Sequence, residues 1–194
     1  KKSHYKEGLG KLKYNEQSAN RAYSQNVIDQ LRKATLDAPQ PVQQIFSLIL
    51  ATGARSEDGH ALLFDCLKED PHDNRFMLLY FWQNKVRKWN IKPLLKNDEN
   101  HAFVIDLIQK QQNYIIEQYG NATQYLFPSF TGTKESFVSP QWTLQEIKRQ
   151  CFKHHVLDKK GKIVSFSWHP LRHTKGTSMA ADGHDILSIM MELG

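Results

Sequence analysis

The sequence has little cysteine and no long apolar run, and each shortage excludes a class of protein. Its two cysteines, Cys66 and Cys151, form no paired motif, which argues against a disulfide scaffold and fits a reducing compartment. No segment approaches the roughly 20 apolar residues of a membrane span. The opening KKSHYKEGLGKLKYNEQ contains no apolar signal core. We therefore expect a cytoplasmic protein with no membrane partner.

Internal repeats and low-complexity linkers are also missing, so one domain is the expected organisation. The 194 residues are 40% hydrophobic, enough for one good core. Residues 1–20 are polar and basic and read as a tail or the end of an interdomain linker, which leaves 21–194 as the domain. Lys and Arg number 26 against 20 Asp and Glu, a net charge of +6, and this excess favours an anionic partner such as nucleic acid.

Apolar spacing and capping residues predict a mostly helical chain. Pro41 suits a first helical turn, Gly53 and Gly120 suit helix ends, and Ser139 before Pro140 suits a helix start. The helix after Pro140 is expected to bury Trp142, Leu144, Ile147 and Cys151. The expected helices cover 21–35, 41–53, 56–64, 103–119, the segment from 140, 171–181 and the segment from Asp185 through 193.

Two short segments instead have the pattern of strands. RFMLLYFWQ (75–83) is apolar and aromatic, and WNIKP (89–93) alternates apolar with polar, which predicts an antiparallel pair. NKVRK (84–88) becomes the turn, with Lys85, Arg87 and Lys88 at its tip. DKKGKIVSF reads as a turn with a short extended segment. The fold class we predict is mostly α with a small antiparallel β-sheet, an α+β fold.

Two boxes of cationic residues stand more than a hundred positions apart. HPLRHTKGT (169–177) contains His169, Arg172 and His173, and ATGARSEDGHALLFDCL places Arg55 just after a helix end. Taken alone, an HxxR cluster is more often a solvated helix start or a satisfied core histidine. Together the boxes resemble the HxLRHT and TGxRxxE boxes of the tyrosine recombinases and phage integrases.

The predicted hairpin adds to this resemblance, which covers residues 40–194. Family members carry a lysine in this turn, eight residues before a proline and leucine, and Lys85 stands eight before Pro93 and Leu94. FDCLKED and KVRKWNIKPL look most like the transposon-encoded branch. The resemblance implies the catalytic-domain fold and a site-specific recombinase, an integrase or transposase of a mobile element, acting through a 3′-phosphotyrosyl intermediate. It also implies double-stranded DNA targets, a dimer or tetramer on DNA, association with a prokaryotic nucleoid, and no cofactor or metal.

The chemistry of DNA cleavage explains these residue types. Negative charge builds on the non-bridging phosphate oxygens, and two guanidiniums, Arg55 and Arg172, can hold it by bidentate hydrogen bonds. Lys85 would donate a proton to the departing 5′ oxygen, and His169 would share acid–base work at the nucleophile. Asp58, where the family usually has glutamate, would orient these side chains. His173 is expected to support them.

The family's nucleophile is expected beyond the printed sequence. In family members a histidine or tryptophan follows the Leu–Gly that here is Leu193–Gly194, and the tyrosine comes about nine residues further on. Tyr114, Tyr119 and Tyr125 fall in or just after a predicted amphipathic helix, where a packing role is expected.

Two other interpretations remain open from the sequence. Cys151, His154, His169 and His173 have the order of a zinc site, although a glycine turn and a strand separate its halves. A non-catalytic DNA-binding protein with a recombinase-like fold would use its basic residues for phosphate contacts. The predicted DNA-binding residues under either recombinase-like reading are Arg87, Lys88, Lys148, Arg149 and Lys175.

Overall fold

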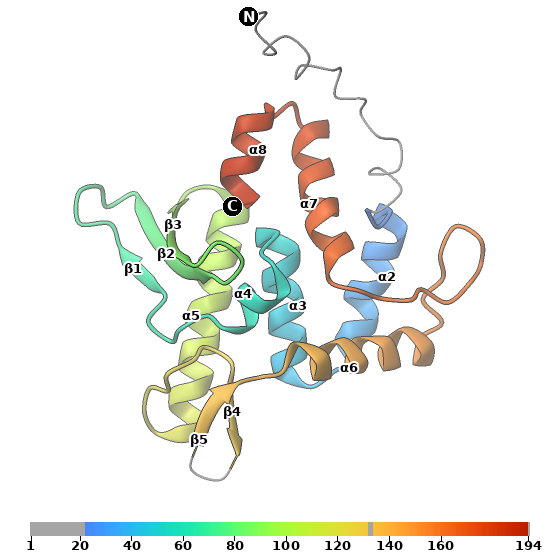
Figure 1. The fold of residues 1–194 in the computed structure, drawn as a ribbon, viewed down its shortest axis with the longest axis horizontal. Helices are drawn as coiled ribbons and strands as arrows, with labels where there is room; N and C mark the ends of the chain where they lie inside the picture. Colours follow the sequence, from blue (N-terminus) through green and yellow to red (C-terminus); the bar gives the residue numbers. More distant parts are fainter. Residues whose placement is uncertain (1–21, 132–133, 194) are drawn as a thin grey trace, which may run out of the picture.

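The computed structural model describes residues 22–131 and 134–193; the predicted tail at 1–20 lies outside them (Figure 1). Helices and strands alternate in groups along the chain. The helices are α2 (Gln25–Thr35), α3 (Gln40–Thr52), α4 (Ser56–His60), α5 (Glu99–Tyr119), α6 (Pro140–Lys153), α7 (His169–Ala181) and α8 (Ile186–Leu193). The strands are β1 (Leu67–Glu69), β2 (Phe76–Gln83), β3 (Lys88–Leu95), β4 (Pro128–Thr131) and β5 (Lys134–Phe137). The predicted mostly helical α+β class is confirmed.

Local capping chemistry sets most helix ends. Ser24, Asp98 and Ser139 accept backbone N–H bonds at the starts of α2, α5 and α6. Gly53 ends α3 in the left-handed region at φ 65°. Because these caps override the apolar pattern, α5 begins four residues earlier than predicted. The prediction that α4 continues to 64 is wrong, since Leu63 instead forms a bridge with Tyr125.

The described chain contains two antiparallel sheets, where the sequence predicted one. β2 pairs with β3 as expected, with Trp82 opposite Trp89, and β1 adds an edge strand. β4 and β5 form a separate two-stranded sheet. These three additional strands have three or four residues each, which is too short for a period-2 pattern to be recognised. The extended segment expected within DKKGKIVSF is a single bridge between Leu157 and Ile163.

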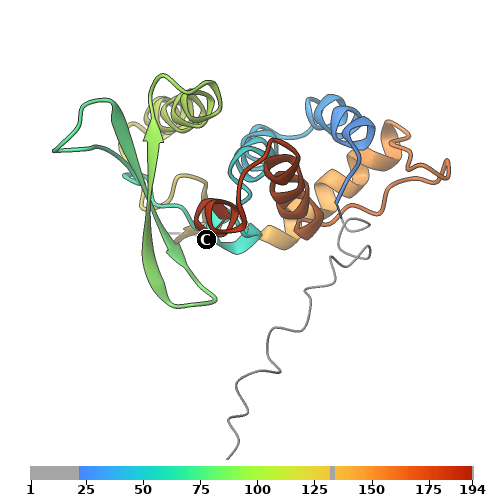
Figure 2. The ribbon, with the colours of Figure 1, turned by 90° about the horizontal axis from the view of Figure 1, so that it is seen from above.

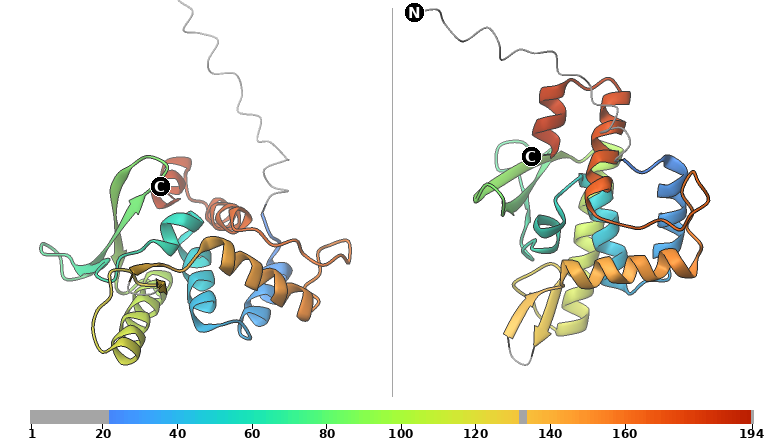
Figure 3. Two further views of the ribbon diagram at one scale, coloured as in Figure 1. Left: turned by 60° about the horizontal axis from the view of Figure 1, so that its bottom comes forward. Right: turned by 45° about the vertical axis from the view of Figure 1, so that its right-hand side comes forward.

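The core lies where α2, α3, α6 and α7 meet, and the three-stranded sheet stands to one side of it. Ile45, Ile49, Phe166 and Leu171 are fully buried there. Figure 2 shows α4 and α8 between the sheet and the helices α3 and α7. The right-hand view of Figure 3 shows β4 and β5 at the lower end, beside α5. Trp142, predicted on the buried side of α6, is 45% exposed, because the buried stripe is formed by Thr143, Ile147, Gln150 and Cys151.

Both cysteines are free and buried in the core. Burial raises the pKa of Cys66 to about 12 and of Cys151 to about 11. The thiols therefore stay protonated and pack as small apolar side chains. Within the part of the chain that the structure describes, no helix combines the length and hydropathy needed to cross a bilayer.

His60 forms a polar link inside this core. Its ring is fully buried, with Nδ1 2.6 Å from the Ser56 carbonyl oxygen and Nε2 2.7 Å from the Thr143 hydroxyl. The Trp168 ring packs edge-on against it, with centroids 5.4 Å apart. Burial lowers the pKa of His60 to about 4. The neutral ring thus ties α4 to the start of α6 and to Trp168.

This buried histidine makes stability depend on pH. The pKa is about 4 in the folded state against 6.5 for the ordinary side chain, so below pH 6.5 the unfolded chain gains a proton that the folded chain does not. Stability should fall as pH drops through this window, by up to about 3 kcal/mol. Urea unfolding should show that the free energy of unfolding falls less between pH 7.0 and pH 4.5 in His60→Gln than in the parent. Exposed His72→Gln should match the parent, and an unchanged loss in His60→Gln would contradict the assignment.

Candidate active site

One cleft brings together residues from three distant segments of the sequence. It has a volume of about 530 Å³ and lies between the start of α4, the β2–β3 turn and the start of α7. Arg55, Lys85, His169 and Arg172, predicted from separate boxes, all line it. Its lining residues are Ala54, Arg55, Ser56, Glu57, Asp58, Asn84, Lys85, Trp168, His169 and Arg172.

Arg55 reaches the cleft because the C-cap of α3, Gly53, stands two residues earlier. Gly53 reverses the chain in a left-handed conformation, and a Cβ there would also come within 2.5 Å of Leu193 Cδ2. The positive φ requires glycine, whereas the contact with α8 involves only the end of a flexible leucine side chain, which can shift. Arg55 follows in an extended conformation as the N-cap of α4. Its side chain is one-third exposed and faces the buried carboxylate of Asp58 at 3.9 Å.

Asp58 connects this arginine to the hairpin. Its side chain is buried, and Oδ1 accepts hydrogen bonds from the Asn84 backbone N–H at 3.0 Å and the Asn84 amide at 3.3 Å. Asn84 is the residue directly before Lys85. One carboxylate thereby holds Arg55 on one side and the beginning of the β2–β3 turn on the other. The sequence predicted an orienting role for Asp58; its link to Asn84 was not foreseen.

Arg172 is half-buried and lines the cleft together with Arg55. Its Nη1 donates to the Gly53 carbonyl at 3.0 Å and to the Leu193 carbonyl at 2.7 Å. Burial first, then repulsion from Arg55, lowers its pKa, while Asp58 opposes the shift. An arginine remains charged after such a shift. Because the two guanidiniums repel each other, an anion bound between them would relieve that repulsion.

Helix α7 begins at this point, two residues earlier than predicted. His169 is its first residue, and its N-cap, Trp168, makes no side-chain capping bond. The positive end of the helix dipole thus adds to the charge of the arginines. His169 Nε2 lies 2.8 Å from His173 Nε2, one turn along. One ring must donate and the other accept, so His173 influences which proton His169 carries.

Lys85 lies in the turn of the hairpin, exposed to solvent. The turn comprises residues 84–87, one shorter than predicted, and Lys88 opens β3. Arg87 has a φ of 51°, a conformation uncommon for a residue other than glycine. The hairpin tip therefore carries three cations beside the cleft, of which Lys85 lines it.

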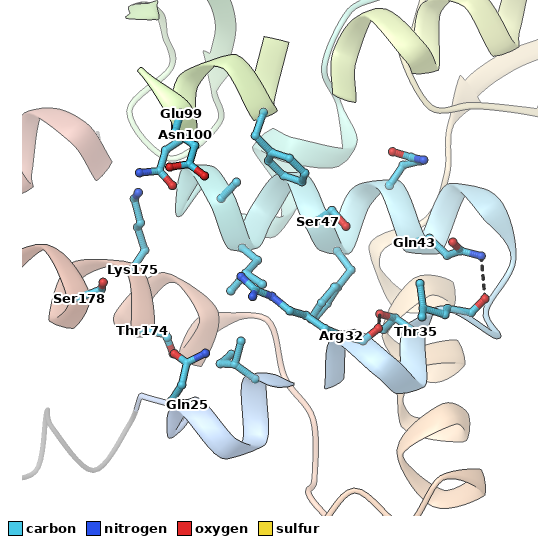
Figure 4. A pocket seen from close by; sticks show the side chains of 17 residues that line it. Gln25, Arg32, Thr35, Gln43, Ser47, Glu99, Asn100, Thr174, Lys175 and Ser178 are labelled. Atoms are coloured by element: carbon cyan, nitrogen blue, oxygen red, sulfur yellow. Dashed lines mark hydrogen bonds between the residues drawn. The ribbon is translucent and has the colours of Figure 1, made fainter. Parts of the chain in front are cut away.

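The other predicted DNA-binding residues lie outside the cleft. Arg149 forms a bidentate ion pair with Glu146 on the exposed side of α6, next to half-buried Lys148. Lys175 lines a second pocket of about 610 Å³ between α2, α3, α5 and α7. Figure 4 shows Lys175 directed across this pocket toward Glu99 and Asn100 at the start of α5.

The four residues of the alternative zinc site do not converge. Cys151 is buried in the core, and His154 lies 3.1 Å from Asp37. His169 and His173 contact each other instead. Across residues 22–131 and 134–193, no group of three or more metal-ligating side chains is assembled.

Two residues that line the cleft and one contact between α7 and α8 could not be predicted from the sequence. Asn84 and Trp168 look like ordinary turn and core residues, and their positions depend on Asp58 and His60. Gly176 sits on α7 opposite α8, where a Cβ would lie 3.3 Å from Leu193 Cδ1. A small residue one turn after Arg172 is the only trace of this packing in the sequence.

Comparison with known proteins defines the class of fold. No family model matches this sequence, and no curated protein does. Solved structures do match, and they are tyrosine recombinases. The mostly helical chain with small antiparallel sheets has the fold of their catalytic domain.

Three particular structures illustrate the match. The XerH site-specific recombinase in a pre-cleavage complex with its difH substrate gives a TM-score of 0.62 at 17% identity, covering 90% of this chain and 47% of that one. The XerA recombinase gives 0.54 at 19%, covering 89% and 54%. A lambda integrase dimer bound to a COC′ core site gives 0.52 at 17%, covering 89% and 56%. This chain thus spans about half the length of these proteins.

The Asp58 link yields a stability prediction. Asp58→Ala would leave the Asn84 N–H and Arg55 without their shared acceptor, so chemical denaturation should show a loss of about 2 kcal/mol. Asp65→Ala removes an exposed partner of Lys68 and should cost less than about 1 kcal/mol. Equal losses for the two variants would show that Asp58 does not hold the hairpin.

Proposed function

We propose that this chain is the catalytic core of a site-specific DNA recombinase of a mobile element, one that breaks and rejoins strands through a 3′-phosphotyrosyl link. The observation that carries the proposal is the single cleft shared by Arg55, Lys85, His169 and Arg172. The fold of the tyrosine recombinases supports it. The DNA-bound complexes of XerH and lambda integrase support double-stranded DNA as the partner, and we propose that the active form is an oligomer on DNA.

The two arginines would bind the scissile phosphate. As a nucleophile attacks phosphorus, charge grows on the non-bridging oxygens, and fixed guanidinium donors stabilise this state more than the ground state. Arg172 is already oriented by the Gly53 and Leu193 carbonyls, so little ordering is required on binding. The start of α7 adds its dipole to the same charge.

Lys85 and His169 would handle the protons. His169 would accept the proton of the attacking hydroxyl. Lys85 on the hairpin would donate a proton to the departing 5′ oxygen. The phosphate is then joined to the tyrosine, and the freed 5′ hydroxyl of a second strand can reverse the reaction. Because the phosphodiester energy is conserved in the new bond, no nucleotide cofactor is needed.

A non-catalytic DNA-binding protein with this fold is the second candidate. One observation favours it: the exposed cations of the hairpin tip, Arg87 and Lys88, could contact phosphates without any strand being cut. Covalent trapping distinguishes the two functions. The full-length protein incubated with a nicked duplex should form an adduct that survives denaturing electrophoresis if it is a recombinase, whereas a binder would shift native gels only.

Replacing Arg172 tests the phosphate clamp. Arg172→Lys keeps the charge but loses the planar donor pair, so cleavage by the full-length protein should fall about a hundred- to a thousand-fold. Duplex binding, measured by fluorescence anisotropy, should change little. Arg75→Lys, an exposed residue paired with Asp73, serves as the matched control. Parent-like cleavage by Arg172→Lys would refute the clamp.

Lys85 can be tested by changing the leaving group. Lys85→Ala should slow cleavage of an ordinary phosphodiester about a hundredfold or more. A substrate with sulfur in place of the bridging 5′ oxygen needs no proton donor, because a thiolate is a far better leaving group. That substrate should restore most of the rate to Lys85→Ala but not to Arg172→Lys, while exposed Lys159→Ala behaves as the parent on both. Failure of the sulfur substrate to rescue would assign Lys85 another role.

A further inference from the structure

One face of the three-stranded sheet is apolar, and no helix or strand of the described residues covers it. Side chains alternate between faces along a strand, and the inner face of β2 and β3 carries buried Met77, Leu79 and Leu94. The opposite face carries Trp82, Ile91 and other apolar side chains. In Figures 2 and 3 the helices lie on the inner side of this sheet and none covers the outer side.

Two tryptophans dominate the outer face where it meets the hairpin tip. Trp82 and Trp89 are cross-strand partners, with ring centroids 5.7 Å apart and planes at 70°. Trp82 supports Trp89 edge-on, and Trp89 remains 53% exposed. Val86 and Ile91 beside it are about half exposed as well. The half-exposed Trp89 ring in this apolar cluster is thus open to a ligand.

The charges beside the tryptophans indicate the kind of ligand. Arg87 in the turn is exposed, and no ion pair joins it to an acidic side chain within residues 22–131 and 134–193. Lys88, paired with Gln83, belongs to the inner face. Cations elsewhere on the sheet differ in this respect, because Lys68 pairs with Asp65 and Lys96 with Glu69. The tip thus combines stacking surface with uncompensated positive charge.

We propose that the Trp82–Trp89 face, with Arg87 in the adjoining turn, is a binding site for an unpaired DNA strand. Aromatic side chains stack on bases whose faces are open, whereas a duplex hides those faces between neighbouring pairs. Cations alongside would hold the phosphates. Lys85 of the same turn lines the cleft, so a strand released there would lie beside the turn that adjoins this face.

A second copy of the chain fits the face less well. Face-to-face pairing would need carboxylates opposite the cations of the tip. At the far end of the sheet, Glu69 and Asp73 are already paired with Lys96 and Arg75. The charge of the tip therefore favours a polyanion over self-association.

The test uses the full-length protein and a fluorescein-labelled oligothymidylate of twelve nucleotides. Trp89→Ala should weaken its binding about tenfold or more, as expected for loss of one stacked base, and Trp89→Phe should retain most of it. Trp142→Ala removes a comparably exposed tryptophan on α6 and should bind as the parent. Arg87→Gln should reduce the salt dependence of binding.

The outcomes separate this proposal from the proposed function. It rests on that function only in taking DNA as the nucleic acid. Equal oligothymidylate affinity in Trp89→Ala and the parent overturns it, as does sedimentation showing a dimer that Trp89→Ala dissociates while the oligonucleotide does not bind. If the parent protein does not cleave the duplex but binds the oligonucleotide in a way that depends on Trp89, the result counts against the recombinase assignment alone.

Discussion

The candidate site depends on holding two arginines close together in a half-buried cleft. Burial and repulsion from Arg55 lower the pKa of Arg172, which means that its charged form is disfavoured at this position. The fold therefore supplies hydrogen-bond acceptors that hold the guanidinium in place. It does so with two backbone carbonyls, Gly53 at the end of α3 and Leu193 at the end of α8. The same contacts join α7 to α3 and α8. The packing of these helices and the orientation of the guanidinium therefore depend on each other.

A second set of polar contacts extends this arrangement to the rest of the cleft. Asp58 balances part of the arginine charge and holds Asn84, so the hairpin that carries Lys85 is anchored at its base while its tip stays exposed. His60, two residues later on α4, fixes the start of α6 and the ring of Trp168. A single short helix therefore positions groups on three sides of the cleft.

Much of this was predictable from particular residues. Gly53 predicted the end of one helix and Ser139 the start of another, because capping depends on local backbone geometry. The aromatic run of β2 predicted its pairing with β3, because a short apolar segment of this kind is typical of a buried strand. Short strands such as β4 escaped prediction because too few residues define a period. Trp142 was misplaced because a two-turn apolar pattern does not say which neighbour the helix will contact; Thr143, bonded to His60, took the buried position instead.

The sequence by itself determined the residue types of the cleft, their order along the chain and the secondary structure that carries them, since these follow from side-chain chemistry and local backbone preference. Only the tertiary structure decided that Arg55, Lys85, His169 and Arg172 share one cleft, that Lys175 faces a different pocket, and that Trp82 and Trp89 stand on an uncovered face. Those outcomes depend on how helices and strands that are more than a hundred residues apart pack against each other. Each such contact depends on the volume and polarity of both partners, and a local sequence pattern describes only one of them.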